Sequence, residues 1–417
     1  GAVFDYTGAS LSLGEKGLRL TGGGELNNTN PFILNSVSSG LWVDGLSKLG
    51  SVTVDAVSGE EGGIRISSVS ELGTVEFNEA GGILLDEGAN LSGQISLNPG
   101  STLSPSGVGL LSSDIELAGG RLKVEDTRIL SGELNVLAPS ELEVSGDLTL
   151  LHPTGLGIGP FTLSLSGGGQ LKVPGDVKLD DEQSELVLGG ISLDRVTSTS
   201  SSKGLRVTSS SLVSTLALSH PSFLEVSEGM DFSGHVELGP SGELELTGPG
   251  EVNSTLSLSG GSLKASESLL WSGLWSQVAD ASIEVSPEKV LIYGGGGHEL
   301  GVHSLEIKGS GKLDLTGPES SLVLSDPQSR LELTGAGSIP RVLVRATPVQ
   351  DRGLQVTGQP SLSGLEFQVD SSLSVTEQFS VDEGILISGV TLTLNDSGTF
   401  ASALVLDGGT LQVTGQP

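Results

Sequence analysis

The chain has 417 residues, with 63 Gly, 17 Pro, no Cys, 3% aromatic residues and a net charge of -31. So few aromatic side chains argue against a conventional α/β enzyme with a wide core, and the lack of Cys excludes a disulfide scaffold. A hydrophobic content of 36% argues against intrinsic disorder. The 51 acidic residues against 20 basic ones argue against nucleic acid as a partner, because phosphate binding requires a basic surface.

A short strand of the form L-x-L or L-x-V recurs along the chain and is often followed by Gly or Pro. Copies occur as GLRLTGG from Gly17, GELELTGPG from Gly242, GKLDLTGPE from Gly311, RLELTGAG from Arg330, GLQVTGQP from Gly353 and TLQVTGQP from Thr410. The residue between the two apolar positions is polar in every copy, and in a strand it points to the opposite face. Each copy therefore predicts a half-buried strand that ends at a turn.

The spacing of these strands predicts the architecture. One series of strand starts advances in steps of 19 or 20 residues: Ile64, Ile83, Leu103, Leu122 and Leu142, then Leu186, Leu205, Leu224, Leu244, Leu263 and Ile283. A second, interleaved series comprises Val75, Ile95, Ile115 and Leu134, then Leu354, Leu373, Leu392 and Leu411. The 400 residues from Leu11 to Leu411 make 20 steps of the same mean length.

A 20-residue coil repeated about 20 times predicts an all-β fold, a parallel β-solenoid that continues through residues 1–417 as one domain. The number of strands in each coil stays open at this point. The two series are 12 residues apart at Leu122 and Leu134, but 7 apart at Leu404 and Leu411. Either a third strand exists or the phase slips at irregular coils.

Two segments break the repeat and are expected to be irregular insertions, near 266–281 and 293–303. The first has apolar residues four apart, which fits a short amphipathic helix or an irregular coil, and it contains Trp271 and Trp275. These two indoles could contact a partner or stack on a sugar, or they could plug a discontinuity in the core. The second segment, YGGGGHELGVH, predicts a flexible glycine loop between two strands.

No motif of a known catalytic class is present, so no catalytic, cofactor-binding or metal-binding residue is predicted and the chain is not expected to be an enzyme. The best metal-like cluster is His298, Glu299 and His303, for which we favour ordinary loop residues. The longest stretch without charged residues, Leu148 to Leu171, contains two prolines and six glycines. It is therefore not expected to span a membrane as a helix.

The coil length, together with GGTLQVTG from Gly408 and SGGGQLKV from Ser166, resembles the repeats of bacterial autotransporter passengers and filamentous-haemagglutinin-type adhesins. The resemblance extends over nearly the whole chain but rests on strand patterns, and few Asn residues mark the turns. It implies a secreted, right-handed β-helix that serves as an adhesin, stalk or surface fibre. No functional residue is carried over from the family.

These observations lead us to expect an extracellular structural protein, a subunit of a cell-surface fibre, sheath or layer. Its expected partner is a further copy of itself, added end to end or laterally, because open ends of a solenoid expose unpaired backbone groups. An adhesin that binds surface glycans or other cell-surface proteins is the alternative. A polysaccharide-degrading β-helix enzyme is a minor third possibility.

Overall fold

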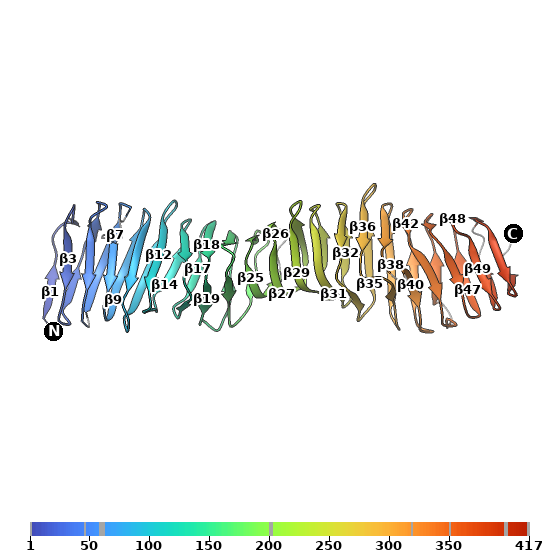
Figure 1. The fold of residues 1–417 in the computed structure, drawn as a ribbon, viewed down its shortest axis with the longest axis horizontal. Coiled ribbons are helices and arrows are strands. Elements are labelled where there is room, and N and C mark those ends of the chain that lie inside the picture. The colour runs from blue at the N-terminus through green and yellow to red at the C-terminus, as the bar shows by residue number, and fades with distance from the viewer. Residues whose placement is uncertain are drawn as a thin grey trace. The chain divides into compact units, whose positions relative to one another are not determined.

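The computed structural model describes residues 2–45, 47–57, 63–199, 203–317, 320–349, 352–395 and 399–414. The described residues contain strands and turns but no helix, and parallel strands stack into a β-solenoid of about 19 turns with roughly 20 residues per turn (Figure 1). The predicted fold class is thereby confirmed. No helix able to cross a membrane occurs among these residues. Contacts divide the chain into two compact units, 1–214 and 215–417.

In the first unit, two faces of each coil are formed by strands of sheets A and B. Sheet B contains β3 (Gly17–Leu20), β6 (Gly40–Val43), β8 (Gly63–Ile66), β10 (Gly81–Leu85), β12 (Thr102–Gly107), β15 (Arg121–Val124), β18 (Ser140–Val144), β21 (Thr162–Ser166), β24 (Glu185–Gly189) and β26 (Gly204–Ser209). Sheet A contains β1 (Val3–Tyr6), β2 (Leu11–Ser12), β4 (Glu25–Asn28), β5 (Phe32–Leu34), β7 (Ser47–Val54), β9 (Val69–Phe77), β11 (Asn90–Leu97), β13 (Leu110–Leu111), β14 (Asp114–Leu117), β16 (Arg128–Leu130), β17 (Leu134–Val136), β19 (Asp147–Leu150), β20 (Leu156–Gly157), β22 (Gln170–Lys172), β23 (Val177–Leu179) and β25 (Ser192–Ser198).

In the second unit a third sheet, C, joins the other two. Sheet B contains β28 (Pro221–Val226), β30 (Glu243–Leu246), β32 (Ser262–Ala265), β35 (Ala281–Val285), β38 (Ser304–Gly309), β41 (Arg330–Leu333), β44 (Gly353–Val356), β47 (Ser371–Val375), β50 (Thr391–Asn395) and β53 (Thr410–Val413). Sheet A contains β29 (Asp231–Leu238), β31 (Glu251–Leu258), β33 (Leu269–Trp271), β34 (Trp275–Gln277), β36 (Val290–Tyr293), β39 (Lys312–Leu315), β42 (Ser338–Ile339), β45 (Ser361–Leu362), β48 (Gln378–Val381) and β51 (Thr399–Ala401). Sheet C contains β37 (His298–Glu299), β40 (Ser321–Leu324), β43 (Arg341–Val344), β46 (Leu365–Phe367), β49 (Ile385–Ser388) and β52 (Leu404–Asp407). β27 (Ser211–Leu218) contains the division between the units.

Within each coil, alternate residues of a strand point inward and outward. In β18, Leu142 and Val144 are fully buried, whereas Glu141 and Glu143 point outward. Burying each such side chain contributes about 1.5–3 kcal/mol, and Leu, Val and Ile fill a narrow interior without needing large rings. The scarcity of aromatic residues is therefore a consequence of the coil circumference.

The long strands of sheet A bend at glycine. β11 pairs first with β13 and then with β14, and its register against β9 shifts between Gly93 and Gln94. Gly93 has a φ of 121°, and a Cβ atom there would lie 1.5 Å from the carbonyl oxygen of Leu72. Only glycine allows the backbones of neighbouring coils to approach this closely.

The residue spacing predicted many, but not all, of the strand pairs correctly. Ile64 lies opposite Ile83, and Leu103, Leu122 and Leu142 lie opposite one another in turn. However, Ile83 lies opposite Pro105 rather than Leu103. A shift of two residues keeps every inward side chain facing inward, because the side-chain period of a strand is two.

The second predicted series combined two different sheets, and this part of the prediction was wrong. Val75, Ile95, Ile115 and Leu134 are register partners in sheet A, whereas Leu354, Leu373, Leu392 and Leu411 all lie in sheet B. Leu373 also lies opposite Leu394 rather than Leu392. Both open explanations for the changing offset therefore apply, since sheet C supplies a third strand and coil lengths vary by two residues.

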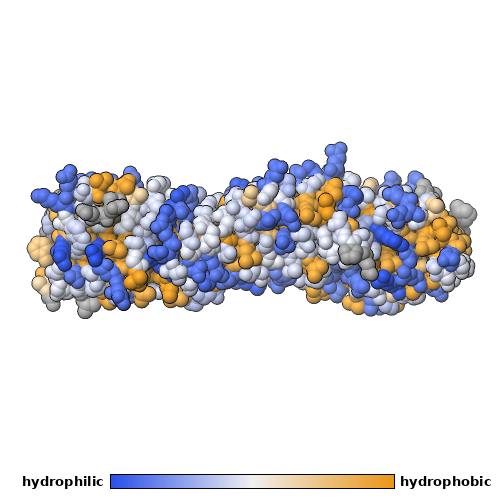
Figure 2. Space-filling model, in the orientation of Figure 1, coloured by the Kyte–Doolittle hydropathy of each residue, from blue (hydrophilic) through white to orange (hydrophobic). Residues whose placement is uncertain are grey.

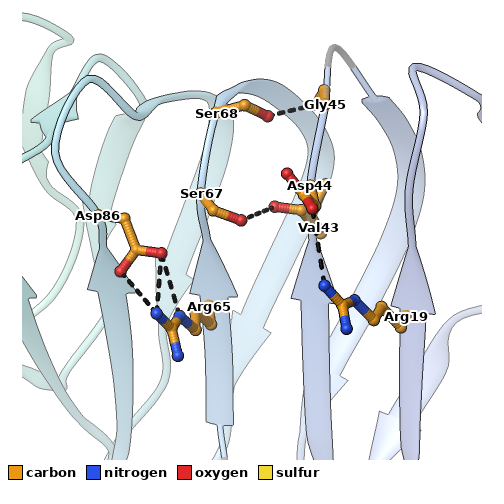
Figure 3. A network of polar contacts seen from close by, with 8 residues as sticks. All are labelled: Arg19, Val43, Asp44, Gly45, Arg65, Ser67, Ser68 and Asp86. Carbon is orange, nitrogen blue, oxygen red and sulfur yellow. Dashed lines mark hydrogen bonds and ion pairs between the residues drawn. The ribbon is translucent and has the colours of Figure 1, made fainter.

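Polar contacts link successive coils outside the core. In the first unit, Arg65 of β8 forms a bidentate contact with Asp86, with Nε to Oδ2 at 3.1 Å and Nη2 to Oδ2 at 3.0 Å (Figure 3). Arg19 of β3 similarly lies 3.7 Å from Asp44, and the Ser68 hydroxyl donates to the Gly45 carbonyl (Figure 3). Each contact joins one coil to the next, so these pairs favour the stacking order of the strands.

Candidate functional sites

The segment around Trp271 and Trp275 continues the solenoid instead of forming a helix. Within residues 266–281, β33 contains Trp271 and β34 begins at Trp275. Both strands pair in parallel with β31 of the preceding coil, through Val252 to Trp271 and Leu256 to Trp275. The helical interpretation was wrong because the apolar spacing of four coincides here with inward positions on two short strands separated by a turn.

Both indoles lie inside the second unit, where they form an aromatic cluster with Tyr293 and His298. Trp271 is 0% exposed and Trp275 is 7% exposed. The Trp275 ring stacks on Tyr293 with centroids 4.2 Å apart and meets Trp271 edge-on at 6.1 Å. Because the rings are buried, contact with a partner through them would require these coils to open, and that role stays a prediction.

Hydrogen bonds fix two members of this cluster. The Trp271 Nε1 group donates to the carbonyl oxygen of Ser254 at 2.5 Å, and the backbone N–H of Trp275 donates to the Tyr293 hydroxyl at 3.0 Å. Burial raises the pKa of Tyr293, so this phenol stays protonated. At Gly295, a Cβ atom would lie 2.3 Å from the Tyr293 hydroxyl oxygen, which explains one glycine of the run that follows the tyrosine.

His298 closes the cluster from sheet C. It is 3% exposed, its ring lies edge-on to Trp275 with centroids 6.2 Å apart, and burial lowers its pKa to about 4. Its Nε2 atom and the Nε1 group of Trp275 have no hydrogen-bond partner among the described residues. A neutral imidazole packed against aromatic rings supports the core and offers no general base to the surface.

The predicted metal-like group does not assemble. In β37, His298 points inward and Glu299 is exposed, so the two side chains lie on opposite faces of the strand. Among the described residues, no three His, Asp or Glu side chains are grouped closely enough to hold a metal ion. The alternation of the strand separates what the sequence places side by side.

The outer faces of the coils carry paired charges. In the second unit, Lys264 lies 3.0 Å from Glu245 across neighbouring strands of sheet B. Burial opposes ionisation of Glu245, but hydrogen bonds from Ser266 and Lys264 outweigh it and the pKa of this carboxyl is lowered. In the first unit, Arg121 contacts both Glu141 and Glu143. Such exposed pairs each contribute about 0–1 kcal/mol, so they keep the surface soluble more than they hold the fold together.

Each unit has one shallow polar groove at the corner where chains enter sheet B. The groove of the first unit has a volume of about 480 Å³ and lies over Gly119, Gly120, Arg121 and Glu141. The groove of the second unit, of about 390 Å³, lies over Gly260, Gly261, Glu306, Arg330 and Glu332. The glycine pairs explain the hollows, because no side chain fills these corners. Both grooves place an arginine and carboxylates on the floor.

The first coil presents an apolar concave surface, which we call the apolar end face, formed by Phe4, Tyr6, Leu11, Leu18, Leu20 and Phe32. Its hollow has a volume of about 500 Å³, and Phe4 is 63% exposed. Among the described strands, β1, β2 and β3 pair on one side only, with β4, β5 and β6 respectively. The last described coil of the second unit also exposes apolar residues, including Val405, Leu406 and Val413.

Sequence reasoning singled out Trp271 and Trp275 but missed Tyr293 and His298, although both lie in the glycine-rich segment that was expected to be a loop. Tyr293 continues the alternation of β36, where Leu291 and Tyr293 point inward. That spacing of two was the available signal. The apolar end face was anticipated only as unpaired backbone, not as a surface made by side chains.

Comparisons with protein-family models, with curated proteins and with solved structures gave no match to this chain. The fold therefore defines its class, a β-solenoid repeat protein.

Proposed function

We propose that this chain is an extracellular structural subunit that assembles end to end with further copies of itself into a surface fibre, sheath or layer. The observation that carries the proposal is the apolar end face on the first coil. A soluble protein rarely leaves such a surface uncovered, and strands with one free edge accept a further strand. The proposal includes no enzymatic activity.

A second copy is the occupant that fits the end face best. Strand β53 is TLQV followed by Thr-Gly, and β3 is GLRL followed by Thr-Gly. Both belong to sheet B, and both are parallel members of it. Stacking β53 of one copy on β3 of the next would place Leu411 over Leu18 and Val413 over Leu20, which continues the inward columns of the solenoid.

The charge of the chain is consistent with such an assembly. With a net charge of -31, lateral contacts between copies meet electrostatic repulsion, whereas end-to-end contacts bury apolar surface. Extended assemblies rather than compact clusters are therefore expected.

The test uses two single variants, Phe4→Lys at one end and Val413→Lys at the other. Analytical ultracentrifugation of the unmodified chain should show mass increasing with concentration, and either variant should reduce this increase. Val108→Lys is the matched control, because Val108 is 78% exposed but lies in a turn within the first unit. A strictly monomeric wild-type chain would refute the proposal.

Mixing the variants tests the head-to-tail arrangement directly. Phe4→Lys leaves one end intact and Val413→Lys leaves the other intact, so an equal mixture should form heterodimers and nothing larger. If the contact instead joined like ends, each variant alone would still form dimers through its intact end.

Binding of an extended glycan is a second candidate, favoured by the two polar grooves. Arginine and carboxylate side chains can hydrogen-bond sugar hydroxyls, and grooves at equivalent corners suit a polymeric ligand. A glycan array probed with the wild-type chain and with Glu306→Gln tests this function. Binding that is absent, or unchanged by the substitution, argues against the groove.

A further inference from the structure

Arg128 occupies an inward position in the wall of the first unit. It begins β16, in which Ile129 points outward and is 42% exposed, while Leu130 points inward. Arg128 is 5% exposed and lies opposite Leu148 of the next coil. An arginine therefore stands in a column of the core where the neighbouring coil has a leucine.

The preceding coil leaves room for this side chain. Leu111 lies opposite Leu130, so counting back two residues along both strands places Gly109 opposite Arg128. Gly109 has no side chain to fill this level. The guanidinium can therefore approach the preceding turn, where its Nη2 group donates to the carbonyl oxygen of Gly107 at 2.8 Å.

Most of the hydrogen-bonding capacity of Arg128 is unused. Its Nε and Nη1 groups are buried and have no partner among the described residues. No described carboxylate forms an ion pair with it. Asp126, two residues earlier, is exposed and acts on Arg128 only at longer range.

Such an arrangement is costly without a ligand. Burial lowers the pKa of Arg128, but a guanidinium stays protonated in proteins, so its charge persists in the wall. A buried charge that has no counter-charge and unsatisfied donors is strongly destabilising. Water could satisfy the N–H groups, but only an anion would also neutralise the charge.

We propose that Arg128 forms a buried binding site for a small monovalent anion, with chloride as the probe, held by its Nε and Nη1 groups. A monovalent ion matches the single positive charge. A small ion is required because Arg128 is almost completely enclosed. The bound anion would complete the hydrogen bonding of the guanidinium and stabilise the first unit.

Thermal unfolding of the full chain in sodium chloride and in sodium gluconate at equal ionic strength tests the proposal. Gluconate is too large to enter the wall. With chloride well above its Kd, the wild-type Tm should be higher in chloride by about 3 °C or more. The difference should disappear in Arg128→Met, a substitution expected to fold because apolar replacement of a buried charge is often tolerated.

Arg19→Met is the matched control, because it also removes one arginine from the first unit but at an exposed position. It should keep the chloride effect. Equal chloride effects in the wild type and in Arg128→Met would overturn the proposal, since they would show a general salt effect.

Crystals grown in bromide give a readout that does not depend on folding stability. An anomalous peak beside Nε and Nη1 of Arg128 is expected. Density for water alone at this position would overturn the proposal.

Discussion

The hydroxyl of Ser184 donates to the carbonyl oxygen of Gly159, in the preceding coil, at 2.6 Å. Gly159 adopts a φ of 59°, and its N–H donates to the Asp180 carboxylate at 3.0 Å. The backbone N–H of Asp181 in turn donates to Ser184 Oγ at 3.0 Å. One buried serine thus closes its own turn and ties it to the turn below.

The same contact recurs at two other places. Ser329 donates to Gly301, whose φ is 57°, and Ser39 donates to Gly14, whose φ is 59°. All three serines immediately precede the start of a sheet B strand or stand one residue before it, and all are at most 1% exposed. The contact therefore sets the entry of the chain into sheet B.

Replacement of Ser184 by Ala should destabilise the first unit by about 1–2 kcal/mol, because the buried carbonyl of Gly159 loses its partner. Urea unfolding at pH 7 measures this loss. Ser106→Ala, at an exposed position of β12, should be neutral within about 0.5 kcal/mol. Equal effects of the two substitutions would contradict the assigned role.

Replacement of Gly93 by Ala should be far more damaging than replacement of Gly88. Both residues have positive φ, 121° and 75° respectively, but nothing lies within 4 Å of a Cβ atom at Gly88. Gly88→Ala should cost only the conformational strain of about 1 kcal/mol. Gly93→Ala adds a collision with the Leu72 carbonyl and should prevent the coil from closing. Circular dichroism and Tm of the two variants check the difference.

Trp275→Ala should destabilise the second unit by about 3–5 kcal/mol, because it removes a buried ring between Trp271, Tyr293 and His298. Trp275→Phe should keep much of the stacking on Tyr293 and lose less. Denaturant unfolding followed by circular dichroism measures both. A loss no greater than that of Trp275→Phe would show that the cavity collapses.

The second unit should lose stability in acid because of His298. Its folded pKa of about 4 lies below the ordinary value of 6.5, so the unfolded chain binds the proton more tightly. The stabilisation is complete above pH 6.5 and is lost progressively as the pH falls to about 4. A shift of this size corresponds to roughly 3 kcal/mol.

His298→Leu should remove this part of the pH dependence, which urea unfolding at pH 7 and pH 4.5 would reveal. His220→Leu, at an exposed position in the same unit, serves as the control and should keep the wild-type slope. An unchanged slope in His298→Leu would mean that His298 is not the titrating group. Carboxylates remain in all variants, so only the difference between variants is diagnostic.

The sequence by itself determined the class of fold and the length of its coil. An L-x-L strand can bury only one face, and its return every 19 or 20 residues requires neighbours above and below, which leaves a parallel solenoid. Alternation also identified inward residues such as Leu122 and Leu142 correctly. These properties are local and repeated, so one sequence is enough to reveal them.

Tertiary structure decided what depends on contacts between coils. A shift of two residues leaves the hydrophobic pattern intact, so the pattern could not distinguish Leu103 from Pro105 as the partner of Ile83. The same limit hid the aromatic cluster, since Tyr293 and His298 meet Trp275 only after a full turn of the chain. Arg128 appears in the sequence as one more polar residue, and only the register of three coils shows that it faces inward. The repeat fixes which faces are apolar, while the stacking of coils fixes which side chains meet.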